Sequence, residues 1–252
     1  MRVFLILLGK ELRAFFLSPV AYVVLALFMV ISGFSFAQAI SALRDMPSES
    51  SIVQWTFYPP WFWFYFFFAF PLITMRLFAE EQKLGTLESL LTAPVRTVQV
   101  LLAKYAAAMI FYVVLWLPNL LYLAILRWVS QGQVDIPAGS LWGSYAILLL
   151  VGLCYVAAGC LASALTRNQI VAAILCFTMI LLHYLIGTFV MFISRDNPVG
   201  MADTVDYFVI VRHMNLFTKG LFDSRAVVYY TSLSVLLLAM THQVLEYRRW
   251  KA

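Results

Sequence analysis

The sequence is short of charge, and this shortage excludes an ordinary soluble fold. Charged residues make up 12% of the 252 residues, whereas soluble domains average about 25%. Hydrophobic residues reach 63%, and the mean hydropathy is +0.90. Because most residues of a domain this size touch its surface, so much apolar side chain cannot be hidden from water. The sequence therefore indicates a protein whose main solvent is lipid.

Cysteine, glycine and proline are also scarce, at 3, 11 and 9 residues. These numbers exclude disulfide-rich secreted folds, collagen and low-complexity disorder. The cysteines, Cys154, Cys160 and Cys176, lie in apolar runs without CxxC or Cys/His spacing, so we interpret them as packing residues. The sequence predicts no metal site and no cofactor bound by this chain.

Catalytic signatures are missing as well. The sequence has no GxxxxGK[ST] phosphate loop, no GxSxG and no HExxH, and its twelve acidic residues lie between apolar runs or at their ends. A proton-driven pump or an intramembrane protease normally carries an acid inside a span. The chain is therefore not expected to be an enzyme, and transport would need an energy source elsewhere. His183, inside an apolar run, is either a functional ionisable group or a neutral hydrogen-bonding residue between helices.

Six uncharged windows of 20 to 31 residues follow one another along the chain. Each can hold one membrane-spanning helix, which needs about 20 apolar residues. We predict an all-α polytopic membrane protein with a single transmembrane domain, residues 1–252. The expected spans are 19–41, 55–75, 105–126, 142–165, 169–193 and 226–246.

The first 17 residues have the pattern of an amphipathic helix in the membrane interface. Apolar side chains share one face, and Arg2, Lys10 and Arg13 lie on the other. Lys and Arg number 11 in the N-terminus, the even-numbered loops and the tail, against 6 in the odd-numbered loops. The positive-inside rule then predicts both termini in the cytoplasm of a multi-pass inner-membrane protein.

The loop after the second window carries a second short helix pattern, over residues 84–93. Thr86 follows Gly85 as a candidate N-cap, and Glu88 places negative charge in the first turn, ahead of Pro94. This helix either rests on the membrane surface or is presented to a cytoplasmic partner, and spacing alone leaves both open.

Three further apolar segments suggest packing roles. Residues 194–225 form an interrupted apolar loop, either a re-entrant hairpin in the outer leaflet or an outer helix covering the bundle. Aromatic residues dominate positions 55–70, as a lipid-facing girdle or as a hydrophobic pathway or dimer seam. Gly152, Gly159 and Ser163 share one helix face and predict close helix packing.

The sequence resembles the permeases of ABC-2 type ATP-binding-cassette exporters over its whole length. The resemblance rests on Glu-Glu-x-x-x-Gly-Thr-Leu-Glu-x-Leu-Leu-x-x-Pro at 80–94, on Lys-Glu-Leu-Arg at 10–13 and on the interrupted loop before the last window. The segment Gly-Leu-Phe-Asp-Ser-Arg-Ala-Val-Val-Tyr-Tyr at 220–230 is similar to the branch that contains the gliding-motility-associated permease.

This resemblance implies half of a twelve-span dimer, with a second permease copy or paralogue and a separate cytoplasmic ATPase that binds ATP and Mg²⁺. The loop after span two would be the coupling helix, with coupling positions Glu81, Gly85, Thr86 and Glu88. The interfacial helix with Lys10, Glu11 and Arg13 would also contact the ATPase, and an accessory membrane protein with a large outer domain accompanies some relatives. No nucleic-acid partner is expected, since basic residues form no soluble patch. A non-transporting subunit of a larger membrane complex and a membrane-embedded lipid enzyme are the alternatives.

Overall fold

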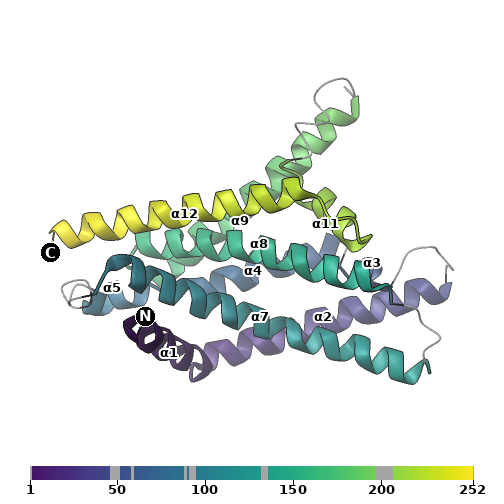
Figure 1. Ribbon diagram of the computed structural model, residues 1–252, viewed down its shortest axis with the longest axis horizontal. Helices are drawn as coiled ribbons and strands as arrows, with labels where there is room; N and C mark the ends of the chain where they lie inside the picture. Colours follow the sequence, from purple (N-terminus) through teal and green to yellow (C-terminus); the bar gives the residue numbers. More distant parts are fainter. Residues whose placement is uncertain are drawn as a thin grey trace.

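The fold is entirely helical in the part of the chain that can be described. The computed structural model describes residues 2–45, 52–57, 60–87, 90, 95–131, 136–196 and 207–251, and these residues contain no strand (Figure 1). The helices are α1 (Arg2–Phe16), α2 (Pro19–Asp45), α3 (Ile52–Phe57), α4 (Pro60–Thr74), α5 (Ala79–Leu84), α7 (Thr97–Val129), α8 (Ala138–Leu165), α9 (Gln169–Asp196), α11 (Ile210–Thr218) and α12 (Ser224–Lys251). The predicted all-α class is confirmed.

Six of the described helical segments are long and apolar enough to cross a membrane, which confirms the predicted number. They are Pro19–Leu43, Phe62–Leu84, Thr97–Val129, Ala138–Leu165, Gln169–Val190 and Ser224–Trp250. The second differs most from the expected 55–75, because α3 is a separate short helix and α4 starts at Pro60, a residue suited to a first helical turn. The third is longer than 105–126, since α7 already includes the charged residue Lys104.

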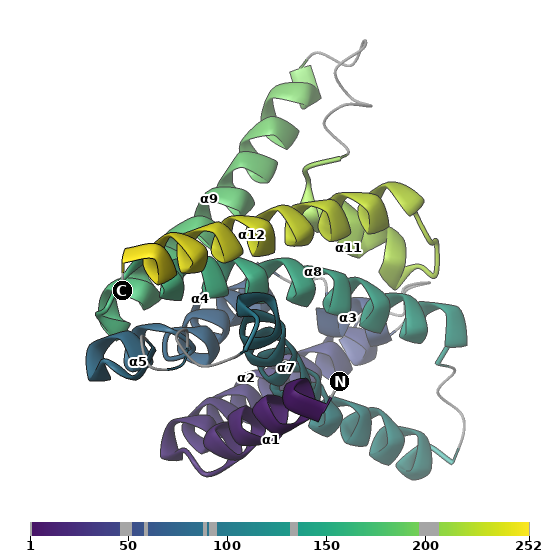
Figure 2. The same ribbon diagram turned by 60° about the vertical axis from the view of Figure 1, so that its left-hand side comes forward.

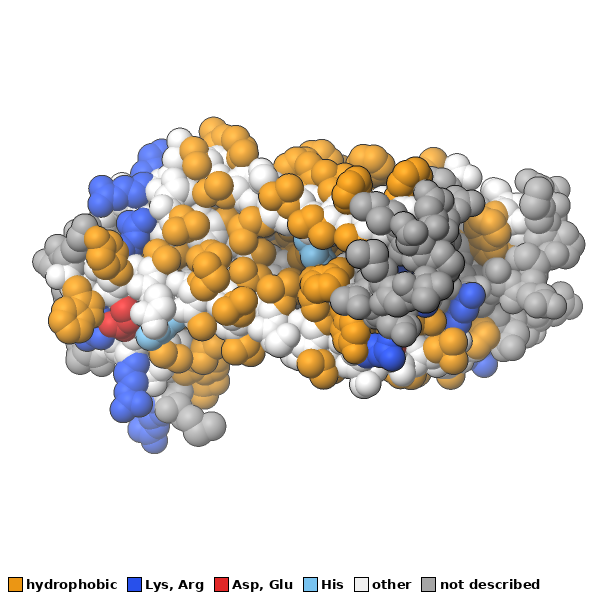
Figure 3. All heavy atoms as spheres, turned by 90° about the horizontal axis from the view of Figure 1, so that it is seen from above, with side chains coloured by type: hydrophobic (Ala, Val, Ile, Leu, Met, Phe, Trp, Pro, Cys, Tyr) orange, Lys and Arg blue, Asp and Glu red, His pale blue; other side chains and the backbone are white. Residues whose placement is uncertain are grey.

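Both chain ends and α5 lie at one end of the bundle, here called the terminus end (Figure 1). Helices α3 and α11, the end of α7 and the start of α8 lie at the opposite end, here called the α11 end. Figure 3 shows hydrophobic side chains over the middle of one face, with Lys and Arg gathered toward the two ends. This distribution fits a bundle whose middle lies in the hydrocarbon core of a bilayer.

The core of the bundle is built around α8 and α4. Buried residues make up 78% and 72% of their most apolar windows, against 22% for both α9 and α12. Neighbouring helices approach α8 closely at its glycines: an added Cβ on Gly152 would lie 2.3 Å from Tyr112 Cε1, and one on Gly159 would lie 2.1 Å from Thr74 Oγ1. The prediction that the small residues of this face mark close packing is confirmed.

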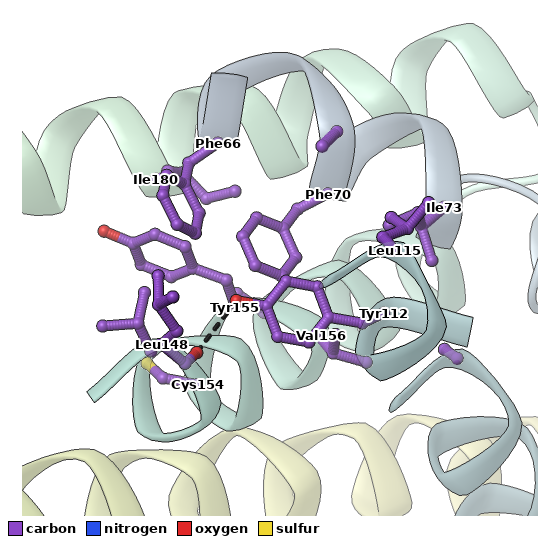
Figure 4. Packing of buried hydrophobic residues seen from close by; sticks show 14 of the residues in the cluster. Phe66, Phe70, Ile73, Tyr112, Leu115, Leu148, Cys154, Tyr155, Val156 and Ile180 are labelled. Atoms are coloured by element: carbon purple, nitrogen blue, oxygen red, sulfur yellow. Dashed lines mark hydrogen bonds between the residues drawn. The ribbon is translucent and has the colours of Figure 1, made fainter. Parts of the chain in front are cut away.

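The aromatic residues of the second window mostly fill this core, and the expectation of a lipid-facing girdle is wrong for them. Phe66 and Phe70 stack on each other and pack against Tyr112 and Tyr155 (Figure 4). The Tyr112 hydroxyl donates a hydrogen bond to the Leu148 carbonyl at 2.9 Å. Because α4 is apolar on every side, its sequence does not distinguish a lipid-facing position from a buried one. In this fold α4 lies at the centre of the bundle.

Helix α9 leaves the bundle toward the α11 end, as Figure 2 shows. His183 of α9 contacts two other helices, α8 and α12: the Tyr155 hydroxyl is 2.9 Å from Nδ1, and the Tyr229 hydroxyl is 2.9 Å from Nε2. These bonds support the interpretation of His183 as a hydrogen-bonding residue between helices. The three cysteines are free and buried, as expected of packing residues.

Helix α11 lies against α8 at the α11 end. The Ser140 hydroxyl donates to the Thr218 carbonyl, and the carbonyl of Phe217 lies so close to Gly143 that an added Cβ would meet it at 2.1 Å. Residues 197–206 of the predicted re-entrant hairpin lie outside the described residues. Both interpretations of this loop stay predictions.

Candidate functional site

Helix α5 is fixed in place by a serine of another helix. The turn at 75–78 separates α4 from α5. Across this turn, the buried Ser163 hydroxyl of α8 accepts hydrogen bonds from the N–H groups of Phe78 and Ala79, both at 3.0 Å, and donates to the Met75 carbonyl at 3.1 Å. Ser163 thus satisfies backbone groups at the start of α5, as an N-cap residue does within its own chain segment.

The end of α5 is also anchored. The Gln82 side-chain amide donates to the Ala164 carbonyl of α8 at 3.0 Å. Gly85 then ends the helix with a φ of 71°, a left-handed conformation that glycine adopts without steric cost. The Thr86 hydroxyl donates back to the Glu81 carbonyl at 3.4 Å. Helix α5 is therefore attached to α8 at both ends and presents Glu81 to the neighbouring helices.

Four charged side chains meet at the terminus end. Lys104 Nζ of α7 lies 3.0 Å from Glu11 Oε1 of α1 and 3.1 Å from Glu81 Oε1 of α5. Lys10 Nζ lies 3.4 Å from the same Glu81 oxygen. The exposed fraction of the side chain is 3% for Lys104, 11% for Glu11, 16% for Glu81 and 59% for Lys10. We call these four residues the terminus cluster.

The buried residue Lys104 links three helices, α1, α5 and α7, through its ion pairs. An ammonium group removed from water is tolerated only when it is paired and hydrogen-bonded. Lys104 meets this requirement with two carboxylates, and its Nζ also lies 5.6 Å from the centre of the Phe78 ring. Loss of either carboxylate would leave the buried ammonium group with one partner fewer, so the pairing of Lys104 depends on both α1 and α5.

A second ion pair lies beside the cluster. Arg76 donates from Nε to Glu80 Oε2 at 2.8 Å and from Nη2 to Glu80 Oε1 at 3.0 Å, a two-bonded arrangement. Its Nη1 donates to the Ser18 hydroxyl at 2.7 Å. Since Ser18 lies between α1 and α2, Arg76 connects the turn before α5 to the start of the first span.

A cavity of about 260 Å³ lies next to these charges, between α1, α2, α4, α5 and α7. Its apolar lining comes from Val20, Ala21, Val24, Leu72, Ile73 and Phe111, among others. Its charged lining comes from Lys10, Glu11, Arg76, Glu80, Glu81 and Lys104. The site thus combines a rigid ion-pair network with an amphipathic hollow.

The structure brings together three of the residues that the sequence proposed for separate elements: Lys10 and Glu11 of the interfacial helix and Glu81 of the coupling loop. Arg13 is exposed in the last turn of α1, where positive charge suits the helix dipole. Glu88 lies outside the described residues.

Lys104, the centre of the cluster, was not among the predicted site residues. Its one signal in the sequence is its position directly before an uncharged window, where a cation must find a partner or reach the headgroups. Among the described residues, no group of three or more His, Cys, Asp or Glu could hold a metal ion.

The family of this chain follows from comparison with known proteins. A search of curated proteins finds no match. The family model described as ABC-2 family transporter protein matches residues 38–218, which include Glu81 and Lys104 but not α1. The match covers 181 of the 252 residues. Together with the six apolar helices, it makes the chain a multi-pass membrane component of transport that is not itself catalytic. The chain belongs to the ABC-2 transporter family.

Proposed function

We propose that this permease forms half of an export pathway driven by ATP hydrolysis on a separate cytoplasmic ATPase subunit, which binds ATP and Mg²⁺. The family match supports this division of labour, and the terminus cluster is the observation that carries it. The cluster attaches Glu81, next to the segment expected to meet the ATPase, to both α1 and a membrane-spanning helix. Movement of α5 would therefore be transmitted to α1 and α7 through these ion pairs.

Movement of α5 would reach three other helices. Through Lys104, displacement of α5 acts on α7 and on α1. Through Ser163 and Gln82, it acts on α8, the most buried of the six candidate spans. In this mechanism Gly85, Thr86 and Glu88 contact the ATPase, whereas Glu81 transmits the movement from inside the subunit. Both termini and the cluster then face the cytoplasm, and the protein lies in the inner membrane.

The export pathway would form between two permeases, either two copies or a copy and a paralogue. Buried residues make up 28% of the most apolar window of α2 and 22% of that of α9, so both helices have broad faces free for lipid or for a second subunit. The aromatic residues of α4 lie mostly inside the subunit, so α4 does not offer a face for this pathway, whereas α2, α9 and α12, with 28%, 22% and 22% of their windows buried, do. Membership of the gliding-type branch, and an accessory protein with an outer domain, are supported by the 220–230 sequence alone.

Copurification with the ATP-binding-cassette ATPase encoded nearest to the gene tests this function. Glu88→Lys reverses a charge at the proposed contact, and like-charge contacts at an interface lower affinity by about 10- to 1000-fold. We expect this variant to insert and fold but to lose the ATPase. The control Glu49→Lys, placed by the charge distribution on the outer side, keeps it. An ATPase that binds neither the native chain nor the control would favour the non-transporting subunit instead.

A further inference from the structure

The cavity beside the terminus cluster has the composition of a binding site for an amphiphile. Its charged lining holds three cations, Lys10, Arg76 and Lys104, and three carboxylates, Glu11, Glu80 and Glu81, so the formal charges sum to zero. A lining of zero net charge offers no general attraction to an anion. It suits a ligand that carries both signs of charge.

Two groups in this lining retain bonding capacity. Glu81 Oε2 is buried and has no hydrogen-bond partner within the described part of the chain, although Oε1 of the same carboxylate is paired. A buried acceptor without a donor is costly, so this oxygen suits a ligand that supplies an N–H group. Lys10 is 59% exposed and donates one hydrogen bond, to Glu81, which leaves N–H donors for an anion.

The rest of the lining points to a ligand with an acyl chain. Val24, Ile73 and Phe111 give the cavity apolar lining and come from three different helices. The surface beside the junction of α1 and α2 is apolar and open: Leu17 is 80% exposed and Tyr22 is 61% exposed. A molecule whose polar part fits the charged lining and whose tail follows the apolar lining therefore reaches the site from the bilayer.

We propose that this cavity binds an aminophospholipid of the cytoplasmic leaflet, of the phosphatidylethanolamine class. Its ammonium group donates to Glu81 Oε2, its phosphate accepts from Lys10, and the start of one acyl chain lies along Val24 and Phe111. Phosphatidylcholine has no N–H group to donate, and phosphatidylglycerol brings negative charge to the carboxylate without a cation. The site holds the lipid between α1 and the start of the first span, and the inference does not depend on the ATPase.

Native mass spectrometry of the purified full chain tests the proposal. The chain is titrated separately with phosphatidylethanolamine, phosphatidylcholine, phosphatidylglycerol and acyl-free glycerophosphoethanolamine. We expect phosphatidylethanolamine to bind at least about tenfold more tightly than phosphatidylcholine and phosphatidylglycerol, as the loss of one charge-assisted hydrogen bond implies. We expect the acyl-free headgroup, which keeps the ammonium group, to bind more weakly than phosphatidylethanolamine because it buries no acyl chain. Equal binding of the three lipids, or a preference for phosphatidylglycerol, would overturn the proposal, and so would equally tight binding of the acyl-free headgroup.

Two variants locate the binding. Ala14 is exposed at the cavity lining, so Ala14→Trp obstructs the cavity without removing an ion pair. Leu5→Trp, at an exposed position of the same helix away from the cavity, is the matched control. We expect Ala14→Trp to abolish the selective adduct and Leu5→Trp to keep it, while Glu81→Gln reduces the preference over phosphatidylcholine about tenfold. Selective binding that survives Ala14→Trp would place the lipid elsewhere and refute the site.

Discussion

Replacing Lys104 by methionine removes the centre of the terminus cluster while keeping a side chain of similar length. Breaking a buried ion pair by removing one partner costs about 3–5 kcal/mol. Here Glu11 and Glu81 are 11% and 16% exposed, and Lys10 remains near both carboxylates, so part of this cost is relieved. We therefore expect a loss of about 2–3 kcal/mol in the free energy of unfolding, which corresponds to about 4–12 °C in Tm for a chain of this size.

A thermal-shift assay on the purified chain in detergent measures this loss. Lys83→Met is the matched control, because Lys83 is exposed on α5, and its Tm should stay within about 1 °C of the native value. A double-mutant cycle adds a sharper test: Lys104→Met combined with Glu81→Gln should cost at least about 1 kcal/mol less than the sum of the single changes. Additive losses, or a Lys104→Met variant as stable as the control, would refute the structural role of the cluster.

Three further changes test the packing that positions the cluster, with the same thermal-shift assay. Gly159→Ala forces a methyl group against Thr74 and should lower the free energy of unfolding by about 1–3 kcal/mol. The control Gly9→Ala has open space around it and should be neutral or slightly stabilising. Equal effects of the two changes would contradict the close approach of α4 to α8 at Gly159. Ser163→Ala leaves two backbone N–H groups without their acceptor and should cost about 1–3 kcal/mol for each, and an unchanged Tm would show that another group caps α5. His183→Phe removes two hydrogen bonds to tyrosines of other helices and should lower the free energy of unfolding by about 1 kcal/mol, since such bonds within membranes are individually weak. A loss above about 3 kcal/mol would indicate a further role for the imidazole ring.

The spans were predictable because lipid imposes a simple rule on sequence. A helix that crosses the hydrocarbon core cannot carry unpaired charge, so the gaps between charged residues mark the spans. The same rule hides how the helices face one another, since a helix in lipid is apolar on the side toward protein and on the side toward lipid. For this reason the aromatic residues of α4 could not be assigned to the core, while the small residues around Gly159 could, because close approach requires them.

The site was predictable in its parts but not in its assembly. Lys10, Glu11 and Glu81 were identified from two separate segments through a family resemblance. Their meeting at Lys104 depends on contacts with Glu11, 93 positions away, and with Glu81, on a different helix, which no local pattern records. The bend that directs Glu81 toward Lys104 depends on Ser163, a residue of another helix whose sequence signal was small size alone. The family resemblance thus identified these charged residues, and tertiary packing paired them.

Site-specific photo-crosslinking tests the central claim, that the terminus end couples the permease to a separate ATPase. A photoreactive phenylalanine analogue at Leu84 would report contact with the ATPase, because Leu84 is 68% exposed at the end of α5. The same analogue at Trp128 is the matched control, since Trp128 is 81% exposed near the opposite end of α7. In membranes containing the ATPase encoded nearest to the gene, irradiation should give a permease–ATPase adduct from position 84 and none from position 128. An adduct from position 128, or none from position 84 although the complex copurifies, would contradict the account.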